Sequence, residues 1–415
     1  MKYDQVLIRF GDLMLKGKNR YIFIKKTLQL IEQNIKDLNV ELIKKHDRVY
    51  LKLNDVETQT IEERLLRVSG IASFSFVKIA EKNLESIIEV GVELLNSRLE
   101  DGTKFKIETK RADKRFYLTS QQVTLEVAPK IIPQIKKKFS VDVRNPDVIL
   151  QIEIRDEAVY LFLGSTKGLG GFPVGVAGKA LSLLSGGIDS PVATFLAMKQ
   201  GVLVEGIHFE STPLTAIESA QKVIDLAKKL ALYAPHHQFN VLMVPFTEIH
   251  QEILKSIPNP YIITIMRRVM FKIAELLAIE NNAYAVITGE SVGQVASQTL
   301  PSLQTIEAVI KLPVLRPVLT YDKQEIINLA RELDLYEISI RPFADCCSIY
   351  VPKNPATKPT EKRALQYERY LNNLDSLIEK AVQETSRWTI KPDTDLELNN
   401  YGFTVKEAWE VIKHD

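Results

Sequence analysis

The first sixty residues show the hydrophobic and polar spacing of a small α+β unit. Residues 5–10 alternate between apolar and polar side chains, as a half-buried strand does. Residues 20–37 carry apolar side chains at helical spacing, which predicts a helix. Residues 40–44 and 49–53 are rich in Val, Leu and Ile and predict two further strands.

Similar patterning continues to residue 165 and predicts a second α+β unit. Its expected helices and strands alternate along the chain, and its last two strands are expected to form a hairpin. The predicted helices are 61–68, 84–98 and 120–138, and the predicted strands are 73–78, 104–109, 148–155 and 158–164. Residues 164–178 then contain six glycines and one proline, which indicates a linker.

From residue 179 onward, apolar runs alternate with amphipathic helices. The runs predict strands at 180–184, 203–209, 241–245 and 283–289 and a short one near Leu315, with helices at 215–232, 261–281 and 323–333. Continuous apolar strands separated by helices are typical of a doubly wound parallel sheet that is covered on both faces. The last 55 residues are expected to be helical and charged, and they show no recognisable chemistry.

The turn after the first of these strands carries the strongest chemical signal. Residues 185–190 read Ser-Gly-Gly-Ile-Asp-Ser between a strand and a helix, so backbone N–H groups and a helix N-terminus face the same point. Gly186 and Gly187 leave room for an anion at the backbone. We expect Ser190 to cap the helix and Pro191 to begin it. Asp189 is the only carboxylate here and is a candidate for holding Mg²⁺ or orienting a pyrophosphate. The alternative is an ordinary strand–helix turn.

Other polar segments are predicted to meet this loop, because ligands of such sheets bind at the carboxyl ends of the strands. His208 and Phe209 end the next strand, where an adenine could be held, although His208 could equally be a core histidine. Residues 287–298 combine small residues and amides after an apolar strand. Arg267 and Arg268 are candidates for offsetting phosphate charge, and either one could be a surface arginine.

The chain has only two cysteines, Cys346 and Cys347, and they are adjacent. Their number argues against a disulfide scaffold and fits a reducing compartment. Thiols near a nucleotide site suggest sulfur or redox chemistry, whereas the structural alternative is two small buried hydrophobic side chains. Six scattered histidines form no metal-binding spacing, so we expect no protein-ligated metal.

Composition narrows the class of protein further. With 415 residues, 45% hydrophobic and 26% charged, the chain is expected to be a soluble multidomain protein. It has neither a signal-peptide pattern nor a long uncharged apolar run, so we expect a cytoplasmic protein that does not enter membranes. Residues 104–138 hold ten basic and three acidic side chains, a charge pattern that favours a polyanion partner over a merely solvated face.

These motifs together resemble the tRNA 4-thiouridine synthetase, or ThiI, family of tRNA sulfurtransferases over essentially the whole chain. The resemblance rests on residues 8–12 and 15–20, on Lys110-Arg111, on the loop at 185–190, on residues 289–298, and on Asp345-Cys346-Cys347 followed by Lys353-Asn354-Pro355. It implies a ferredoxin-like domain at 1–60, a THUMP RNA-binding domain at 61–165, a linker at 166–178, and a PP-loop ATP pyrophosphatase domain at 179–415.

The resemblance also implies specific site residues. Cys347 would carry the sulfur, Asp189 would act in catalysis, and Cys346 is the less favoured sulfur carrier. The implied ATP-binding residues are Leu183, Leu184, Ser185, Gly186, Gly187, Asp189, Ser190, His208, Phe209, Arg267, Gly289 and Gln298. The implied RNA-binding residues are Lys104, Lys106, Lys110, Arg111, Lys114, Arg115, Lys136, Lys137 and Lys138.

For function, the resemblance implies that ATP with Mg²⁺ adenylates O4 of uridine 8 in tRNA and that a persulfide on Cys347 then delivers sulfur to C4. A cysteine desulfurase is the expected sulfur donor, either Cys346 or an external thiol would resolve the persulfide, and a homodimer is expected. Some family members carry a C-terminal rhodanese-like domain, which this sequence is expected to lack. A role with a thiamine-pathway sulfur-carrier protein is therefore less secure. Two alternatives remain open: another adenylating tRNA-thiolating enzyme, and an RNA-binding module with a vestigial nucleotide site.

Overall fold

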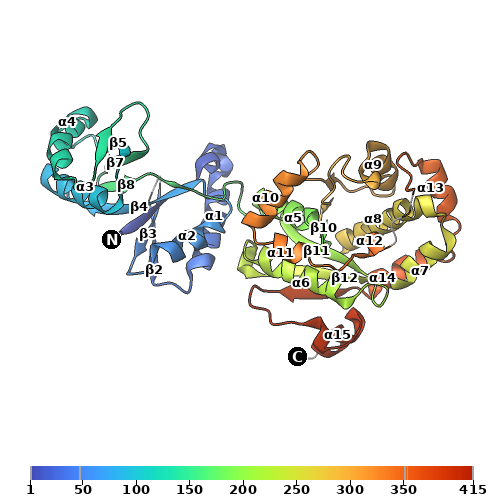
Figure 1. The fold of residues 1–415 in the computed structure, drawn as a ribbon. Helices are drawn as coiled ribbons and strands as arrows, with labels where there is room; N and C mark the ends of the chain where they lie inside the picture. Colours follow the sequence, from blue (N-terminus) through green and yellow to red (C-terminus); the bar gives the residue numbers. More distant parts are fainter. Residues whose placement is uncertain (1, 46–47, 350–351, 353, 414–415) are drawn as a thin grey trace. The chain divides into compact units, whose positions relative to one another are not determined.

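The computed structural model describes residues 2–45, 48–349, 352 and 354–413. The chain divides into two compact units, Met1–Phe172 and Pro173–Asp415, whose elements are drawn in Figure 1. In the described part of the chain, no helix combines the length and the apolar character needed to cross a membrane.

The first unit is built on one mixed sheet with the strand order β2-β3-β1-β4-β8-β7-β5-β6, and β9 also pairs with β4. Its first half contains β1 (Gln5–Arg9), α1 (Arg20–Ile35), β2 (Val40–Lys44), β3 (Val49–Leu53), α2 (Thr58–Leu66) and β4 (Ser73–Ala80), with 3-10 turns at Gly11–Leu15 and Gly17–Asn19. Strand β1 is buried on both faces, because Val6 and Ile8 pack in one core cluster and Leu7 packs in another.

The second half of this unit contains α3 (Leu84–Arg98), β5 (Thr103–Arg111), α4 (Ser120–Ile131), β6 (Phe139–Val141), β7 (Val148–Ile154) and β8 (Val159–Leu163), with a 3-10 turn at Ile132–Gln134. Strands β7 and β8 form the predicted antiparallel hairpin. The predicted helix at 120–138 was too long. Pro129 and Pro133 each lack a backbone N–H, and the chain leaves the helical path at Ile135, whose backbone is extended.

The glycine-rich segment is more ordered than a linker. Thr166 and Lys167 form strand β9 and pair with Phe74 and Ser73 of β4. Gly170 also makes backbone hydrogen bonds with residues next to β4: its N–H donates to the Ile71 carbonyl oxygen at 2.8 Å, and its carbonyl oxygen accepts from the Gly70 N–H at 2.7 Å. The first half of the segment predicted as a linker over 166–178 is thus paired with neighbouring backbone, because backbone pairing can order a glycine-rich chain that has little side-chain packing.

The second unit contains a six-stranded sheet with the order β14-β13-β10-β11-β12-β15. Its first five strands pair in parallel, as predicted, and β15 pairs antiparallel with β12 at the edge. The strands are β10 (Lys179–Leu183), β11 (Leu203–Glu210), β12 (Phe239–Pro245), β13 (Ala285–Ile287), β14 (Val314–Leu315) and β15 (Ser386–Ile390). Strand β15 corrects the expectation that the last 55 residues are all helical.

Helices cover both faces of this sheet (Figure 1). Leu181 of β10 packs with the core residues of α8, whereas the Ser182 hydroxyl bonds Thr194 of α5 at 2.7 Å on the opposite face. The helices are α5 (Asp189–Lys199), α6 (Ile217–Ala231), α7 (Thr247–Ser256), α8 (Ile262–Glu280), α9 (Leu300–Glu307), α10 (Lys323–Glu332), α11 (Tyr336–Ser339), α12 (Cys346–Ile349), α13 (Glu361–Glu368), α14 (Leu374–Gln383) and α15 (Val405–Ile412), with 3-10 turns at Pro235–His237, Asn259–Tyr261, Ala296–Gln298 and Leu398–Asn400.

Candidate active site

The loop between β10 and α5 is held in shape by its own serines. The Ser185 N–H donates to Ser190 Oγ at 2.9 Å, and the Gly187 N–H donates to Ser185 Oγ at 3.3 Å. The helix begins at Asp189, and its N-cap is Ile188, which makes no side-chain cap. The expectation that Ser190 caps the helix was wrong, because the Ser190 hydroxyl bonds back to Ser185 instead.

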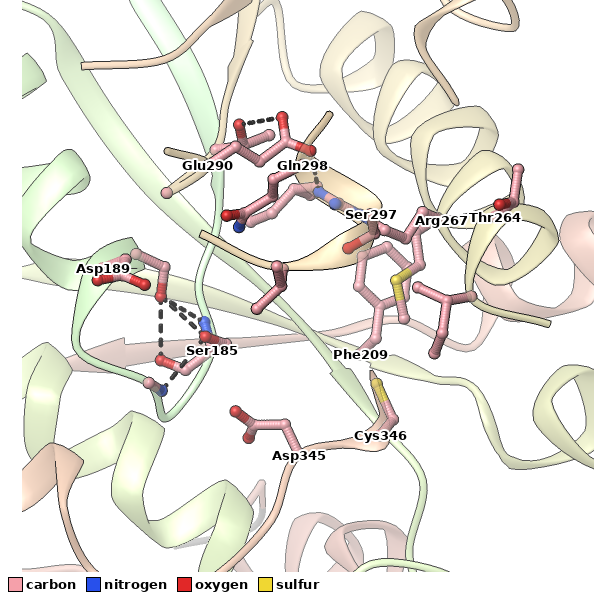
Figure 2. Close-up of a pocket in the computed structure, with 18 of the residues that line it drawn as sticks. Ser185, Asp189, Phe209, Thr264, Arg267, Glu290, Ser297, Gln298, Asp345 and Cys346 are labelled. Carbon is pink, nitrogen blue, oxygen red and sulfur yellow. Dashed lines mark hydrogen bonds and ion pairs between the residues drawn. The ribbon is translucent and has the colours of Figure 1, made fainter. Parts of the chain in front are cut away.

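A cavity of about 490 Å³ opens beside this loop at the carboxyl ends of the parallel strands. Of the twelve predicted ATP-binding residues, eleven line it, and Gly186 is the exception. Apolar side chains, including Ile207, Phe209 and Met270, form one part of the wall, while the loop and residues 288–290 form another. Figure 2 shows Ser185 and Asp189 on one side, and Phe209, Arg267 and Gln298 on another. Such a shape suits a ligand with an anionic end and a flat apolar end.

Asp189 lines the cavity, and its carboxylate is held by two side chains that the sequence did not single out for this role. Its carboxylate accepts from Lys323 Nζ at 2.6 Å and from Gln294 Nε2 at 3.0 Å. Lys323 is the first residue of α10 and lies 134 residues from Asp189. No local signal marks it, since its position here depends on how α10 packs against α5.

His208 and Phe209 lie where the strand order placed them. The His208 ring is almost fully buried and its Nδ1 lies 3.1 Å from the Leu184 carbonyl oxygen, yet the residue still lines the cavity. Phe209 packs edge-on against Phe246, with ring centroids 5.3 Å apart. His208 therefore fits both interpretations from the sequence: it is a buried histidine with a backbone partner, and it also lies at the cavity wall.

The two candidate arginines of α8 have different surroundings. Arg268 is buried and is bound to Glu368 and to the Thr305 carbonyl oxygen, so it holds helices together rather than facing the cavity. Arg267 lines the cavity and pairs with Glu290, which also binds Arg316 at 2.7 Å. Burial raises the pKa of Glu290, but Arg267 and Arg316 outweigh burial and hold that pKa below its ordinary value. Glu290 lies within the segment that we singled out, although the sequence alone assigned it no role.

The segment with the cysteines reaches the same cavity. Asp345 and Cys346 line it, and the Gly186 N–H donates to Asp345 Oδ2 at 3.0 Å. Cys346 is buried within the core cluster around α8. The backbone of Cys347 lies in α12, while its side chain, like residue Lys353, lies outside the described part. The structure thus brings one predicted thiol residue to the loop and leaves the position of the other thiol undescribed.

Basic residues of the first unit divide into exposed lysines and paired arginines. Arg111 donates to the carbonyl oxygens of Phe116 and Leu118, so it shapes the loop after β5. Arg115 pairs with Asp113 and Asp156, and the Lys82 and Arg115 hydrogen bonds lower the pKa of Asp113. Lys106 lies 3.9 Å from Glu108. The side chains of Lys104, Lys110, Lys114, Lys136, Lys137 and Lys138 are exposed.

Within the described residues, no group of three or more His, Cys, Asp or Glu side chains is placed to hold a metal ion. Asp189 is the carboxylate of the loop at 185–190; it lines the cavity, and Lys323 and Gln294 donate to its two oxygens. A Mg²⁺ ion that arrives with substrate phosphates needs only one or two protein carboxylates, so this donor set fits such an ion.

The parallel sheet, the loop at 185–190 and the cavity beside it define a PP-loop type of α/β nucleotide-binding domain. Family models agree: the model described as thiamine biosynthesis protein (ThiI) matches residues 175–372, the ThiI ferredoxin-like domain matches residues 5–75, and the THUMP domain matches residues 81–163.

Curated relatives and solved structures support the same family. A probable tRNA sulfurtransferase of Acholeplasma laidlawii is 49% identical over 97% of each chain, and one of Bacillus subtilis is 42% identical over 94% of this chain and 96% of that one. A 4-thiouridine synthetase–RNA complex with bound ATP is 35% identical, covers 94% of this chain and all of that chain, and has a TM-score of 0.86. The chain belongs to the ThiI family of tRNA sulfurtransferases, which confirms the predicted resemblance and fold class.

Proposed function

We propose that this protein is an ATP-dependent tRNA sulfurtransferase that converts uridine 8 of tRNA into 4-thiouridine. One observation carries the proposal: a single cavity joins the loop at 185–190 to Asp345 and Cys346. Adenylation requires an anion site for the phosphates of ATP, and thiolation requires a sulfur-carrying segment close to it. The relatives named tRNA sulfurtransferase and the ATP-bound 4-thiouridine synthetase neighbour support the same activity.

In the adenylation step, the loop amides and the start of α5 would hold the β- and γ-phosphates of ATP. Asp189 and Lys323 would orient the pyrophosphate, and Asp189 is the group that would hold Mg²⁺ brought by ATP. Phe209 and the apolar wall would hold the adenine. O4 of uridine then attacks the α-phosphorus and pyrophosphate leaves, which converts a poor leaving oxygen into AMP.

In the sulfur step, we assign the persulfide to Cys347. Its outer sulfur attacks C4 of the adenylated uridine, and AMP leaves. A thiol must then attack the Cys347 sulfur of the remaining S–S bond, which releases the base sulfur and leaves Cys347 in a disulfide with that thiol. Cys346, its neighbour in α12, and an external thiol are the two candidates for this role. A cysteine desulfurase would load the persulfide, and a thiamine-pathway sulfur carrier would be a second recipient of the sulfur.

The proposed domain plan follows the predicted boundaries, with a ferredoxin-like domain at 1–60, a THUMP domain at 61–165, a connecting segment at 166–178 and the PP-loop domain at 179–415. The exposed lysines of residues 104–138 would contact tRNA phosphates, which position a nucleic acid without reading its sequence. A homodimer in the cytoplasm is part of this proposal.

The test combines purified protein, unmodified tRNA, ATP-Mg²⁺, cysteine and a cysteine desulfurase. Digested tRNA is then analysed by mass spectrometry for 4-thiouridine, with Cys346→Ser and Cys347→Ser beside the wild type. We expect product from the wild type and none from Cys347→Ser. Sulfur at C2, or at another base, would replace the assignment with a different thiolating enzyme. Bound tRNA without pyrophosphate release would favour an RNA-binding module.

A further inference from the structure

Residues 339–346, which we call the thiol segment, are tied to the phosphate loop and to a buried lysine. The Gly186 N–H donates to Asp345 Oδ2 at 3.0 Å, and Ser339 Oγ donates to the Gly187 carbonyl oxygen at 3.3 Å. Lys222 Nζ donates to the carbonyl oxygens of Arg341 and Phe343, at 3.1 Å each. Lys222 is almost fully buried, so these carbonyl oxygens stabilise a charge that has left water.

The three successive amides of the loop have unequal partners. Serine hydroxyls of the loop itself accept from the Ser185 and Gly187 N–H groups. The Gly186 N–H instead donates to a carboxylate that lies 159 residues away in the sequence. A hydroxyl can rotate away from an incoming ligand at little cost, whereas a carboxylate carries the same sign of charge as a phosphate.

Lys222 and Asp345 both lie close to Gly186 and leave no room for a side chain there. A Cβ atom at Gly186 would lie 3.0 Å from Lys222 Cε and 3.3 Å from Asp345 Oδ1. The glycine therefore admits an anionic oxygen to the loop backbone, and in this structure that oxygen belongs to Asp345. The next residue, Cys346, is packed in the core cluster around α8.

We propose that Asp345 occupies the phosphate position of the loop when no nucleotide is bound, and that an incoming phosphate group displaces it and frees the thiol segment. The inference rests on the proposed phosphate site at residues 185–190. A phosphate and the Asp345 carboxylate compete for the Gly186 N–H and repel each other. Asp345 is thus a positioning residue that keeps Cys346 packed until the loop is filled.

This competition links the two halves of the reaction. Coupling between sites is reciprocal, so the factor by which Asp345 weakens phosphate binding equals the factor by which phosphate weakens the closed state of the thiol segment. The packing of Cys346 therefore loosens when a nucleotide fills the loop, and this thiol stays packed in its absence.

The first experiment measures the affinity of inorganic pyrophosphate, without Mg²⁺, by calorimetry in a Cys347→Ser background. We expect Asp345→Ala to bind pyrophosphate about tenfold more tightly than its parent, because the internal competitor is gone. Asp345→Asn keeps the hydrogen-bond acceptor without its charge, and its affinity should fall between the two. Asp393→Asn, an exposed carboxylate of the same unit, is the control for net charge and should change nothing.

The second experiment follows alkylation of Cys346, which is the one cysteine left in that background. Saturating pyrophosphate should accelerate its reaction with iodoacetamide about fivefold or more. Asp345→Ala should react fast already and should respond little to pyrophosphate. If Asp345 acted only through its charge, its removal would tighten pyrophosphate binding without exposing Cys346. Pyrophosphate affinity and the alkylation rate of Cys346 together therefore separate competition from simple charge repulsion.

Three results would overturn the proposal. Weaker pyrophosphate binding by Asp345→Ala would make Asp345 a ligand rather than a competitor. Tight binding with unchanged Cys346 reactivity would show that the thiol segment does not respond to the loop. Absence of pyrophosphate binding in every variant would remove the phosphate site itself, and with it the proposed function. Thermal unfolding checks each variant, and the isosteric Asp345→Asn serves if Asp345→Ala is unfolded.

Discussion

At the scale of single residues, the carboxylate of Asp189 is fixed by two long-range hydrogen bonds. Lys323 and Gln294 hold its two carboxylate oxygens at the cavity wall. We predict that Asp189→Asn lowers the rate of tRNA-dependent pyrophosphate release by roughly a hundredfold, because the charge that orients the pyrophosphate is gone. The affinity for tRNA, measured by filter binding, should stay within about threefold of the wild-type value. A large loss of tRNA affinity would instead make this loop part of the RNA site.

Glu290 permits a prediction of pH dependence. It is almost fully buried between Arg267 and Arg316, so removal of its charge leaves two arginines without their main partner. We predict that Glu290→Gln lowers the free energy of unfolding by about 3–5 kcal/mol near pH 7. Because the folded-state pKa of Glu290 lies below its ordinary value, its stabilisation is present above the unfolded-state pKa and is lost as pH falls through the folded-state pKa.

Urea unfolding of the wild type and of Glu290→Gln should therefore converge only as pH falls through the folded-state pKa of Glu290, which lies below the ordinary value of a glutamate. Glu307→Gln is the matched control, because Glu307 binds the same Arg316 at 2.7 Å but is substantially exposed. That substitution should cost less than about 1 kcal/mol. A constant gap between wild type and Glu290→Gln across the acid range would contradict the assignment of the charged form to Glu290.

The site combines residues that local sequence order fixes with residues that only the packing of distant elements brings there. Ser185, Gly187 and Phe209 were predicted because a strand, a turn and a helix in order fix their place at a sheet edge. Lys323 and Lys222 were not predicted, because their positions depend on how α10 and α6 pack against other elements. A long-range ion pair leaves no periodicity or spacing in the sequence.

At the scale of elements, the meeting of the 288–290 segment with the start of α5 determines whether the cavity can form. A Cβ atom at Gly289 would lie 2.5 Å from the Ser190 backbone nitrogen. We predict that Gly289→Ala destabilises the protein by about 1–3 kcal/mol and also abolishes ATP binding, because the helix start must shift. Thermal unfolding and calorimetry with ATP measure the two effects.

Gly187 provides the comparison for this prediction. A Cβ atom there would meet only Ser185 Oγ, at 3.4 Å, which is an ordinary contact. Gly187→Ala should therefore keep its stability while it loses ATP affinity, since the added methyl group occupies space that a phosphate would use. Equal stability of the two variants would mean that the Gly289 contact is not needed for folding.

The elements that the sequence missed share one cause. Strand β15 (Ser386–Ile390) is short and mostly polar, and it is a strand because β12 offers it an open edge. Strand β9 exists because β4 offers backbone partners to a glycine-rich segment. Helices with apolar side chains at regular helical spacing, such as α3 and α8, were predicted within one residue at each end, since local spacing decides them.

At the scale of the whole molecule, positive charge is concentrated in the first unit, where residues 104–138 hold ten basic and three acidic side chains. The structure divides these residues by role. Arg111 and Arg115 have partners within the protein, while the lysines at 110, 114 and 137 are exposed. Exposed lysines are the better candidates for phosphate contacts, because within the described residues these three side chains make no hydrogen bond that RNA binding would break.

The last prediction follows from that division. Combined Lys110→Gln, Lys114→Gln and Lys137→Gln should weaken tRNA binding and reduce the slope of log affinity against log salt by roughly two to three, about 0.7–0.9 for each lost phosphate contact. Lys255→Gln, Lys311→Gln and Lys391→Gln remove the same charge from exposed sites of the second unit and are the control. Arg111→Gln should lower stability as well as affinity, since it frees the carbonyl oxygens of Phe116 and Leu118. If the first triple variant keeps the wild-type salt slope while the control loses it, the main phosphate contacts belong to the second unit, and the proposed THUMP contacts are wrong.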